Sequence, residues 1–198
     1  MKRTSAGWVA LIMLLAGCGG PGASSPASGA PVLAPANVTL RDESGAEESI
    51  EARAARSKHT VLVFFSSECP VQKAHDARLR DLIATYQAKG VAFAAVVSEV
   101  GVDMAAEREE VKKRLPGLAV LEDKNAALAD ALGVEYSTHA VLLDHDRRVL
   151  YSGGIDSERT HLSSGGDPWL KRAIDEALAG APVAKAKTEP LGCPLRKH

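Results

Sequence analysis

Residues 60–73, TVLVFFSSECPVQK, constrain the fold of this chain more than any other stretch. Their apolar run at 61–65 predicts a strand buried on both faces, as central parallel strands are. A polar turn follows, then Cys69 and Pro70, and an amphipathic pattern that continues to about Ala88. Proline is favoured at the first helical position, where its missing N–H costs nothing. The sequence therefore places Cys69 at, or one residue before, the start of a helix that follows a buried strand.

This position favours a reactive thiol at Cys69. The partial positive charge of a helix N-terminus stabilises a thiolate, so a cysteine there is a good nucleophile. The alternative is a structural cysteine, because a free cysteine packs as a small hydrophobe. A core cysteine belongs more naturally in the apolar run than in the polar turn after it, and we therefore prefer the reactive interpretation.

The first 18 residues predict an export signal. Lys2 and Arg3 precede an apolar stretch at 8–15, which is too short to span a bilayer permanently. Its end, Leu-Ala-Gly-Cys18, resembles the lipobox of bacterial lipoproteins, in which the cysteine is lipidated and becomes the new N-terminus. The alternative is an ordinary signal peptide cleaved nearby, with Cys18 incidental. We expect a lipoprotein signal peptide at 1–18 and lipidation at Cys18.

Residues 19–35 are rich in glycine, proline, serine and alanine and lack an apolar period, which predicts a flexible tether. A folded domain is expected at 36–180 and a C-terminal tail at 181–198. By the same resemblance, the expected location is the cell envelope, on a membrane facing the periplasm. Gly19 stands where inner-membrane lipoproteins often carry aspartate, and this slightly favours the outer membrane.

Charge and cysteine content exclude several classes of protein. The formal net charge is −1 and no block of like charge is present, so nothing indicates a nucleic-acid partner. The three cysteines, at 18, 69 and 193, are too few and too far apart for a disulfide-stapled miniprotein or a zinc finger. The sequence also lacks a phosphate-binding loop, a Ser-His-Asp context and a clustered His/Cys metal motif, and we expect no cofactor.

The apolar pattern predicts an α/β fold, a sheet with helices on both faces and an antiparallel edge hairpin. Strands are expected at 38–40, 61–65, 91–97 and 118–121, with the hairpin at 140–143 and 148–151. Helices are expected as one turn from Ser49 and at 70–88, 103–115, 124–132 and 169–179, with Pro168 at the first position of the last helix.

Three stretches resemble the peroxiredoxin-like branch of the thioredoxin superfamily, the redoxin or AhpC/TSA-type proteins. They are Phe-Ser-Ser-Glu-Cys69-Pro70, the hairpin segments at 141–144 and 149–156, and the end TEPLGCPL at 188–195. The similarity covers roughly residues 36–198. It implies a thioredoxin-like fold and the thiol–disulfide or peroxide chemistry of antioxidant proteins. The implied substrates are a protein disulfide, a small thiol or a peroxide.

The sequence departs from the best-known members of this branch at three points. Gln72 stands where a Cys-x-x-Cys motif has its second thiol, so no disulfide closes within the turn. The threonine before the reactive cysteine and the catalytic arginine of typical peroxidases are not identifiable. Thr138 stands in the place of the cis-proline of thioredoxins. Because a cis bond before a residue other than proline costs about 3 kcal/mol, we expect a trans or otherwise altered loop.

Cys193 is the candidate partner of Cys69. The tail beyond the last predicted helix spans roughly 40 Å when extended at about 3.3 Å per residue, enough to cross a small domain. Cys193 could resolve a sulfenic acid or mixed disulfide on Cys69 into an intramolecular disulfide. The alternative is a structural disulfide that holds the tail in an oxidising compartment. The candidate catalytic residues are thus Cys69, Cys193, Pro70 and Thr138.

Two further functions stay open. A non-catalytic metal-delivery module would hold a soft ion such as Cu(I) with Cys69, Cys193 and His139. The Cys-x-x-x-Cys of copper chaperones with this fold is missing, which counts against that function. An inactive structural lipoprotein is the third hypothesis, and the altered Thr138 loop would be its signature. Superfamily geometry places His139 near Cys69, whereas His75 lies nearly two helical turns beyond the cysteine.

Overall fold

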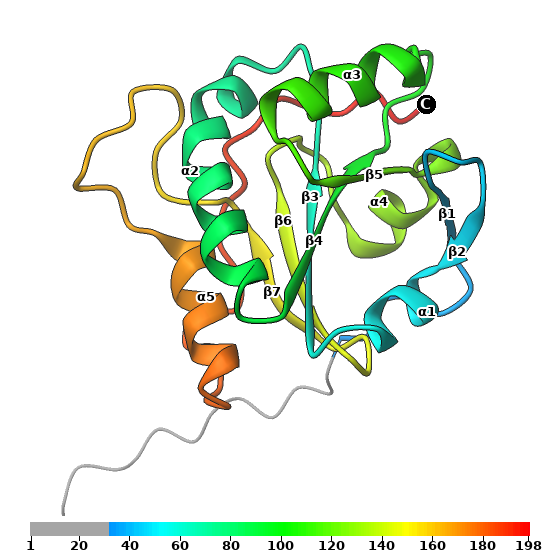
Figure 1. Cartoon of the computed structure of the whole chain (residues 1–198). Coiled ribbons are helices and arrows are strands. Elements are labelled where there is room, and N and C mark those ends of the chain that lie inside the picture. The colour runs from blue at the N-terminus through cyan, green and yellow to red at the C-terminus, as the bar shows by residue number, and fades with distance from the viewer. Residues whose placement is uncertain (1–31) are drawn as a thin grey trace, which may run out of the picture. The chain divides into compact units, whose positions relative to one another are not determined.

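A mixed β-sheet forms the centre of the computed structural model, which describes residues 32–198 (Figure 1). The predicted signal peptide, the lipidation site Cys18 and most of the predicted tether lie outside these residues. The strands are β1 (Thr39–Arg41), β2 (Glu47–Ser49), β3 (His59–Phe64), β4 (Val91–Val97), β5 (Ala119–Glu122), β6 (Ala140–Asp144) and β7 (Val149–Gly153). The helices are α1 (Ile50–Ala55), α2 (Pro70–Gln87), α3 (Met104–Arg114), the short 3₁₀ helix η1 (Lys124–Ala126), α4 (Ala127–Leu132) and α5 (Trp169–Leu178).

β3 is the central strand of the sheet, whose order across the described residues is β2-β1-β5-β4-β3-β6-β7. It pairs in parallel with β4 and antiparallel with β6, and all of its residues are buried. Side chains alternate along a strand. Val61 and Val63 therefore face one hydrophobic core, and Leu62 and Phe64 face the other.

Helices cover both faces of the sheet. Apolar side chains of α2, α3 and α5 pack into the core on one face, and those of α1 and α4 pack into the core on the opposite face. In Figure 1, α2 and α5 lie on one side of the sheet and α1 and α4 on the other, and β6 and β7 form an antiparallel hairpin at one edge of the sheet. The predicted α/β architecture is confirmed.

Two element predictions need correction. The sheet has a second antiparallel edge, because β1 pairs with β2. The sequence predicts no strand at Glu47–Ser49, since its side chains are polar and Ser49 also serves as the N-cap of α1. Pro168 is the N-cap residue of α5 and not its first helical residue. The restricted φ of proline suits either position, so the sequence does not separate them.

The folded part begins before residue 36, the predicted start of the domain. Leu33 forms an isolated bridge with Arg148, and the N–H of Ala34 donates to the carbonyl of Arg147 at 2.9 Å. Ala34 is fully buried. Backbone atoms make these contacts, so no repeating apolar pattern in the sequence marks them. Composition alone therefore assigns this segment to the tether.

The C-terminal tail returns across the domain (red in Figure 1). It first lies along β7, where the N–H of Ser152 donates to the carbonyl of Ala186 at 2.9 Å and the N–H of Thr188 donates to the carbonyl of Ser152 at 3.2 Å. It then passes the loop before β6, where Pro194 forms a bridge with Tyr136. The tail is therefore packed against the domain on both sides of its cysteine.

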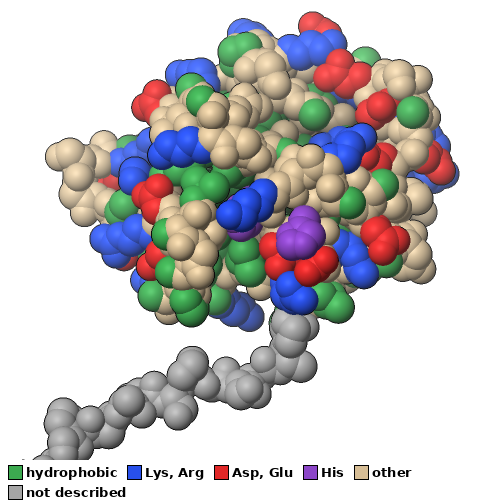
Figure 2. Space-filling model, turned by 60° about the horizontal axis from the view of Figure 1, so that its bottom comes forward, with side chains coloured by type: hydrophobic (Ala, Val, Ile, Leu, Met, Phe, Trp, Pro, Cys, Tyr) green, Lys and Arg blue, Asp and Glu red, His purple; other side chains and the backbone are tan. Residues whose placement is uncertain are grey.

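No helix within residues 32–198 is long and apolar enough to cross a membrane. Basic and acidic side chains are interspersed on the face shown in Figure 2, in keeping with the nearly balanced net charge. No field of a single sign therefore dominates that face.

Candidate redox site

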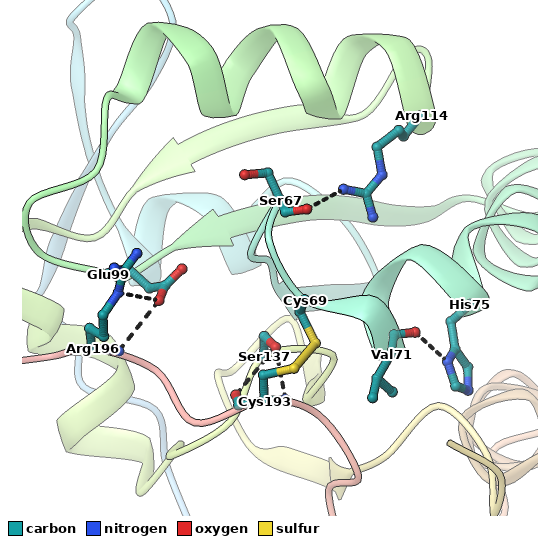
Figure 3. The surroundings of a disulfide bond; sticks show 9 residues. All are labelled: Ser67, Cys69, Val71, His75, Glu99, Arg114, Ser137, Cys193 and Arg196. Atoms are coloured by element: carbon teal, nitrogen blue, oxygen red, sulfur yellow. Dashed lines mark hydrogen bonds and ion pairs between the residues drawn. A yellow bond between two sulfur atoms is a disulfide. The ribbon is translucent and has the colours of Figure 1, made fainter. Parts of the chain in front are cut away.

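A disulfide joins Cys69 to Cys193, 124 residues apart in sequence, with Cα atoms 5.8 Å apart (Figure 3). The predicted pairing is present. This Cα separation lies in the range that disulfides bridge without displacement of the backbone. The bond connects the start of α2 to the C-terminal tail, so two distant segments of the sequence meet at one site.

The local sequence positions Cys69 between β3 and α2. Its N–H donates to the carbonyl of Ser66 at 3.3 Å and closes the turn after β3. Cys69 is the N-cap of α2, Pro70 follows it, and its carbonyl accepts the first helical hydrogen bond from Lys73 at 3.0 Å. Only 2% of the surface of Cys69 is exposed, whereas the neighbouring Glu68 is exposed to solvent. After reduction, the helix N-terminus would favour the thiolate of Cys69.

Two residues of α3 hold the turn that precedes Cys69. The carboxylate of Glu107 accepts hydrogen bonds from the N–H of Ser67 at 3.1 Å and from its hydroxyl at 2.5 Å. The guanidinium of Arg114 donates to the carbonyl of Ser67 at 3.1 Å and lies over the ring of Phe65. These side chains are buried, and hydrogen bonds to charged groups are the stronger kind. We call Ser67, Glu107 and Arg114 the Ser67 clamp.

The sequence alone does not reveal the roles of Glu107 and Arg114. Their spacing of seven residues puts them on one face of a helix. Most of their neighbours on α3 are also charged, so the pattern does not reveal which charges are buried. Arg114 contacts the turn and not the sulfur of Cys69, and it therefore positions the cysteine indirectly.

Gln72 occupies the position of the second thiol of a Cys-x-x-Cys motif. It is fully buried, and its amide donates to Asp76 at 3.3 Å. Asp76 also receives two hydrogen bonds from Arg114, at 2.7 and 3.1 Å, so Gln72 belongs to the same polar network as the Ser67 clamp. Among residues 32–198, Cys193 is thus the only cysteine with which Cys69 can pair.

The loop before β6 holds Cys193 through backbone contacts. The N–H of Ser137 donates to the carbonyl of Cys193 at 2.8 Å, and the N–H of Cys193 donates to the hydroxyl of Ser137 at 3.2 Å. The N–H of Leu195 donates to the carbonyl of Glu135 at 2.9 Å. Gly192 lies so close that an added Cβ would be 1.6 Å from the carbonyl oxygen of Ser137. The tail therefore docks as a short antiparallel segment that requires glycine at this point.

Thr138 has the altered loop conformation that the sequence predicts. No peptide bond within residues 32–198 is cis, so Thr138 follows a trans bond. Its φ of 62° is left-handed, which is unfavourable for a β-branched residue by about 1–2 kcal/mol. Its N–H donates to the carbonyl of Phe64 at 2.7 Å, at the end of β3. Thr138 thus ties the tail-binding loop to the strand that leads to Cys69.

The side chain of His139 contacts Ser152 and Phe64. Its Nε2 is 2.8 Å from the hydroxyl of Ser152, and its ring packs edge-on against Phe64 at 6.3 Å between centroids. Burial and, to a smaller extent, the positive charge of Lys187 together lower the pKa of His139 to about 4. The imidazole is therefore neutral at neutral pH. Within residues 32–198, no group of three or more His, Cys, Asp or Glu side chains is arranged to hold a metal ion.

His75 belongs to a separate buried network on α2. Its Nδ1 is 2.8 Å from the carbonyl of Val71, and its Nε2 is 3.1 Å from Asp156. Burial alone would raise the pKa of Asp156, but hydrogen bonds from His75 and Arg78 hold it below its ordinary value. In Figure 3, His75 lies beyond Val71 from the disulfide, in agreement with its predicted place along the helix.

The strand–cysteine–helix arrangement, the mixed sheet and the helices on both faces define a protein with a thioredoxin-like fold. The chain belongs to the AhpC/TSA family, which it matches over residues 33–152, more than half of its length. The match includes Cys69 and Thr138 but ends before Cys193. The chain is therefore an AhpC/TSA family protein with a thioredoxin-like fold. No curated protein sequence matches it.

Solved structures share this fold. A hypothetical protein from Sinorhizobium meliloti 1021 is 26% identical, with a TM-score of 0.70 over 85% of this chain and 94% of its own. An uncharacterised conserved protein from Geobacillus kaustophilus is 22% identical, with a TM-score of 0.73 over 84% of this chain and 90% of its own. The thioredoxin domain of a thiol-disulfide oxidoreductase from Bacteroides vulgatus is 16% identical, with a TM-score of 0.52 over 63% and 89%.

Proposed function

We propose that this protein is a thiol–disulfide oxidoreductase of the cell envelope, in which Cys69 and Cys193 form the redox pair and a lipid on Cys18 anchors the chain to a membrane facing the periplasm. The observation that carries the redox function is the disulfide between the N-cap of α2 and the docked tail. The lipobox-like sequence supports the anchor, and Gly19 slightly favours the outer membrane.

The two cysteines have different roles in the proposed reaction. In the reduced protein, the Cys69 thiolate attacks one sulfur of a substrate disulfide, and the other substrate sulfur leaves as a thiolate. The Cys193 thiolate then attacks the Cys69 sulfur of the mixed disulfide, and the second substrate thiolate leaves. The substrate gains two electrons, and the protein loses two as the Cys69–Cys193 bond forms. Pro70 sets the start of α2 under Cys69, and Thr138 holds the loop that docks Cys193.

The family match favours a peroxide as a second candidate substrate. The Cys69 thiolate would attack a peroxide oxygen, release an alcohol or water and become a sulfenic acid. Attack by the Cys193 thiolate on that sulfur would expel hydroxide, which leaves as water, and form the same disulfide. Both candidates therefore end in the oxidised state that the structure contains.

The test is an equilibrium titration in buffers of reduced and oxidised glutathione, followed by mass analysis of the trapped thiols. The proposal expects the protein to change between dithiol and disulfide as one two-electron couple while it stays folded. Reduced protein should also reduce a model protein disulfide, and Cys69→Ser should abolish that activity. Hydrogen peroxide in place of the disulfide distinguishes the second candidate. A disulfide that thiols reduce only after the domain unfolds would contradict the proposal in favour of a structural bond.

A further inference from the structure

The two cysteines of the disulfide differ in their exposure to solvent. Cys69, at the start of α2, is 2% exposed and is bonded to the tail through Cys193. Cys193 is partly exposed, and the residue that follows it, Pro194, is exposed. Ser137 engages both backbone polar groups of Cys193, which holds the residue in this orientation. An incoming group from solvent therefore meets Cys193 before it meets Cys69.

The two sulfurs also differ as leaving groups. Thiol–disulfide exchange is faster when the sulfur that leaves is the more stable thiolate. Cys69 is the N-cap of the 18-residue helix α2, whose N-terminus stabilises a negative charge. Cys193 lies in an extended tail and has no such helix. Departure of Cys69 is therefore favoured over departure of Cys193.

Local charge agrees with the same direction of attack. The attacking species in exchange is an anionic thiolate. The exposed carboxylate of Glu68 is adjacent to Cys69 in sequence and would repel an anion that approaches there. Cys193 has no acidic neighbour in sequence, because Gly192 precedes it and Pro194 follows it.

We propose, on the basis of the proposed redox function, that the electron donor of this protein is a thiolate that attacks the sulfur of Cys193, with Cys69 as the leaving group. A bond forms between the donor sulfur and the Cys193 sulfur, and the bond between Cys193 and Cys69 breaks. The electron pair of that bond stays on Cys69 as its thiolate. A second donor thiolate then attacks the donor sulfur of the mixed disulfide and releases Cys193 as a thiolate. The donor is oxidised to a disulfide, and the protein gains two electrons.

The first test identifies the cysteine that carries the donor. The oxidised full chain with Cys18→Ser contains no cysteine other than Cys69 and Cys193. It is mixed briefly with glutathione, quenched with acid, alkylated with N-ethylmaleimide and mapped by peptide mass. A second arm uses a thioredoxin with one active-site cysteine, which separates a protein donor from a small one. We expect the donor on Cys193 and maleimide on Cys69, in at least about tenfold excess over the reverse, because Cys193 is the more exposed residue and Cys69 the better leaving group.

A donor adduct mainly on Cys69, or equal adducts on the two cysteines, would overturn this inference and leave the redox function intact. A bond that resists both donors would overturn the redox function as well.

The second test loosens the end of the tail. The side chain of Lys197 is 7% exposed and contacts Asp130 at 2.8 Å and Glu135 at 2.7 Å. Lys197→Gln removes both ion pairs and should shift the adduct toward Cys69 by at least about threefold, because the tail then covers that sulfur less well. The control is Lys113→Gln on α3, where the side chain is 75% exposed and the ratio should not change. An unchanged ratio in Lys197→Gln would contradict the role of the tail.

Discussion

Ser137 holds the backbone of Cys193 through two hydrogen bonds: the N–H of Ser137 donates to the carbonyl of Cys193 at 2.8 Å, and the N–H of Cys193 donates to the hydroxyl of Ser137 at 3.2 Å. Neither bond depends on the disulfide. The reduced tail therefore keeps its own docking site, and the two thiols stay at a high effective concentration. Cys69 and Cys193 are therefore held close together although they are 124 residues apart in sequence.

Removal of Cys193 should leave Cys69 without an intramolecular partner. We expect Cys193→Ser to accumulate mixed disulfides or over-oxidised forms of Cys69, as shown by mass analysis after mild oxidant. Alkylation of Cys69 in this variant should accelerate below the free-cysteine value of about pH 8.5, because the residue is at a helix N-terminus. A rate that rises only above that pH would contradict the nucleophilic role. The parent protein, in which the disulfide can form, is the control.

Gly192→Ala should slow closure of the disulfide. The added Cβ would lie 1.6 Å from the carbonyl oxygen of Ser137, so the tail must move away from its docking site. Loss of that proximity should reduce the rate of disulfide formation by about tenfold or more, measured by quenched alkylation after oxidant is added. Gly165→Ala is the matched control, because its nearest neighbour is a side-chain oxygen 3.6 Å from the added Cβ. Equal closure rates would show that the tail does not need this close approach.

Loss of the Ser67 clamp should destabilise the protein and perturb Cys69. In Glu107→Ala, the buried N–H and hydroxyl of Ser67 lose their acceptor, which should lower the free energy of unfolding by about 2 kcal/mol. The alkylation rate of Cys69 in the reduced variant should change with it, because the turn is no longer held. Glu109→Ala on the same helix removes a carboxylate whose side chain is 76% exposed, and its effect should stay within about 0.5 kcal/mol. Denaturant unfolding and alkylation kinetics measure the two effects.

His139 should make the stability depend on pH in the acid range. Burial lowers its pKa from 6.5 to about 4 in the folded protein. Between these values the unfolded chain binds a proton that the folded protein lacks, so the free energy of unfolding falls as pH decreases through this window. The contribution of His139 to the slope is at most about 1.4 kcal/mol per pH unit. His139→Asn should flatten the profile, whereas His145→Asn, at an exposed turn position, should not. Equal slopes in the parent protein and His139→Asn would contradict the buried neutral imidazole.

The anchor prediction concerns a residue outside the described part of the chain. Cys18→Ser should release the protein from the membrane fraction without unfolding the domain, because the predicted lipid attaches only there and a tether separates it from the fold. Fractionation after a salt wash, with circular dichroism of the released protein, measures both outcomes. Persistence of the variant in the membrane fraction would remove the basis for lipidation at Cys18.

The sequence by itself determined the frame of the site. A run of apolar residues at 61–65, a polar turn and a Cys-Pro pair placed Cys69 at the N-cap of α2, and the structure has that arrangement. The same local patterns predicted the edge hairpin and the ends of most helices. These features depend on side-chain periodicity and on capping groups within a few residues, so a short window of sequence contains what decides them.

Only the tertiary structure decided which distant groups complete the site. The contact of Ser137 with Cys193 joins residues 56 apart, and that of Ser67 with Glu107 joins residues 40 apart. The contact with Cys193 uses the backbone N–H and carbonyl of that residue, groups that almost every residue carries. The contact with Ser67 uses only one of the several carboxylates on α3. His139 likewise packs against Phe64, because the face on which a side chain lies follows from the register of β3 with its neighbours. Such choices depend on how whole segments pack together, and no local pattern encodes them.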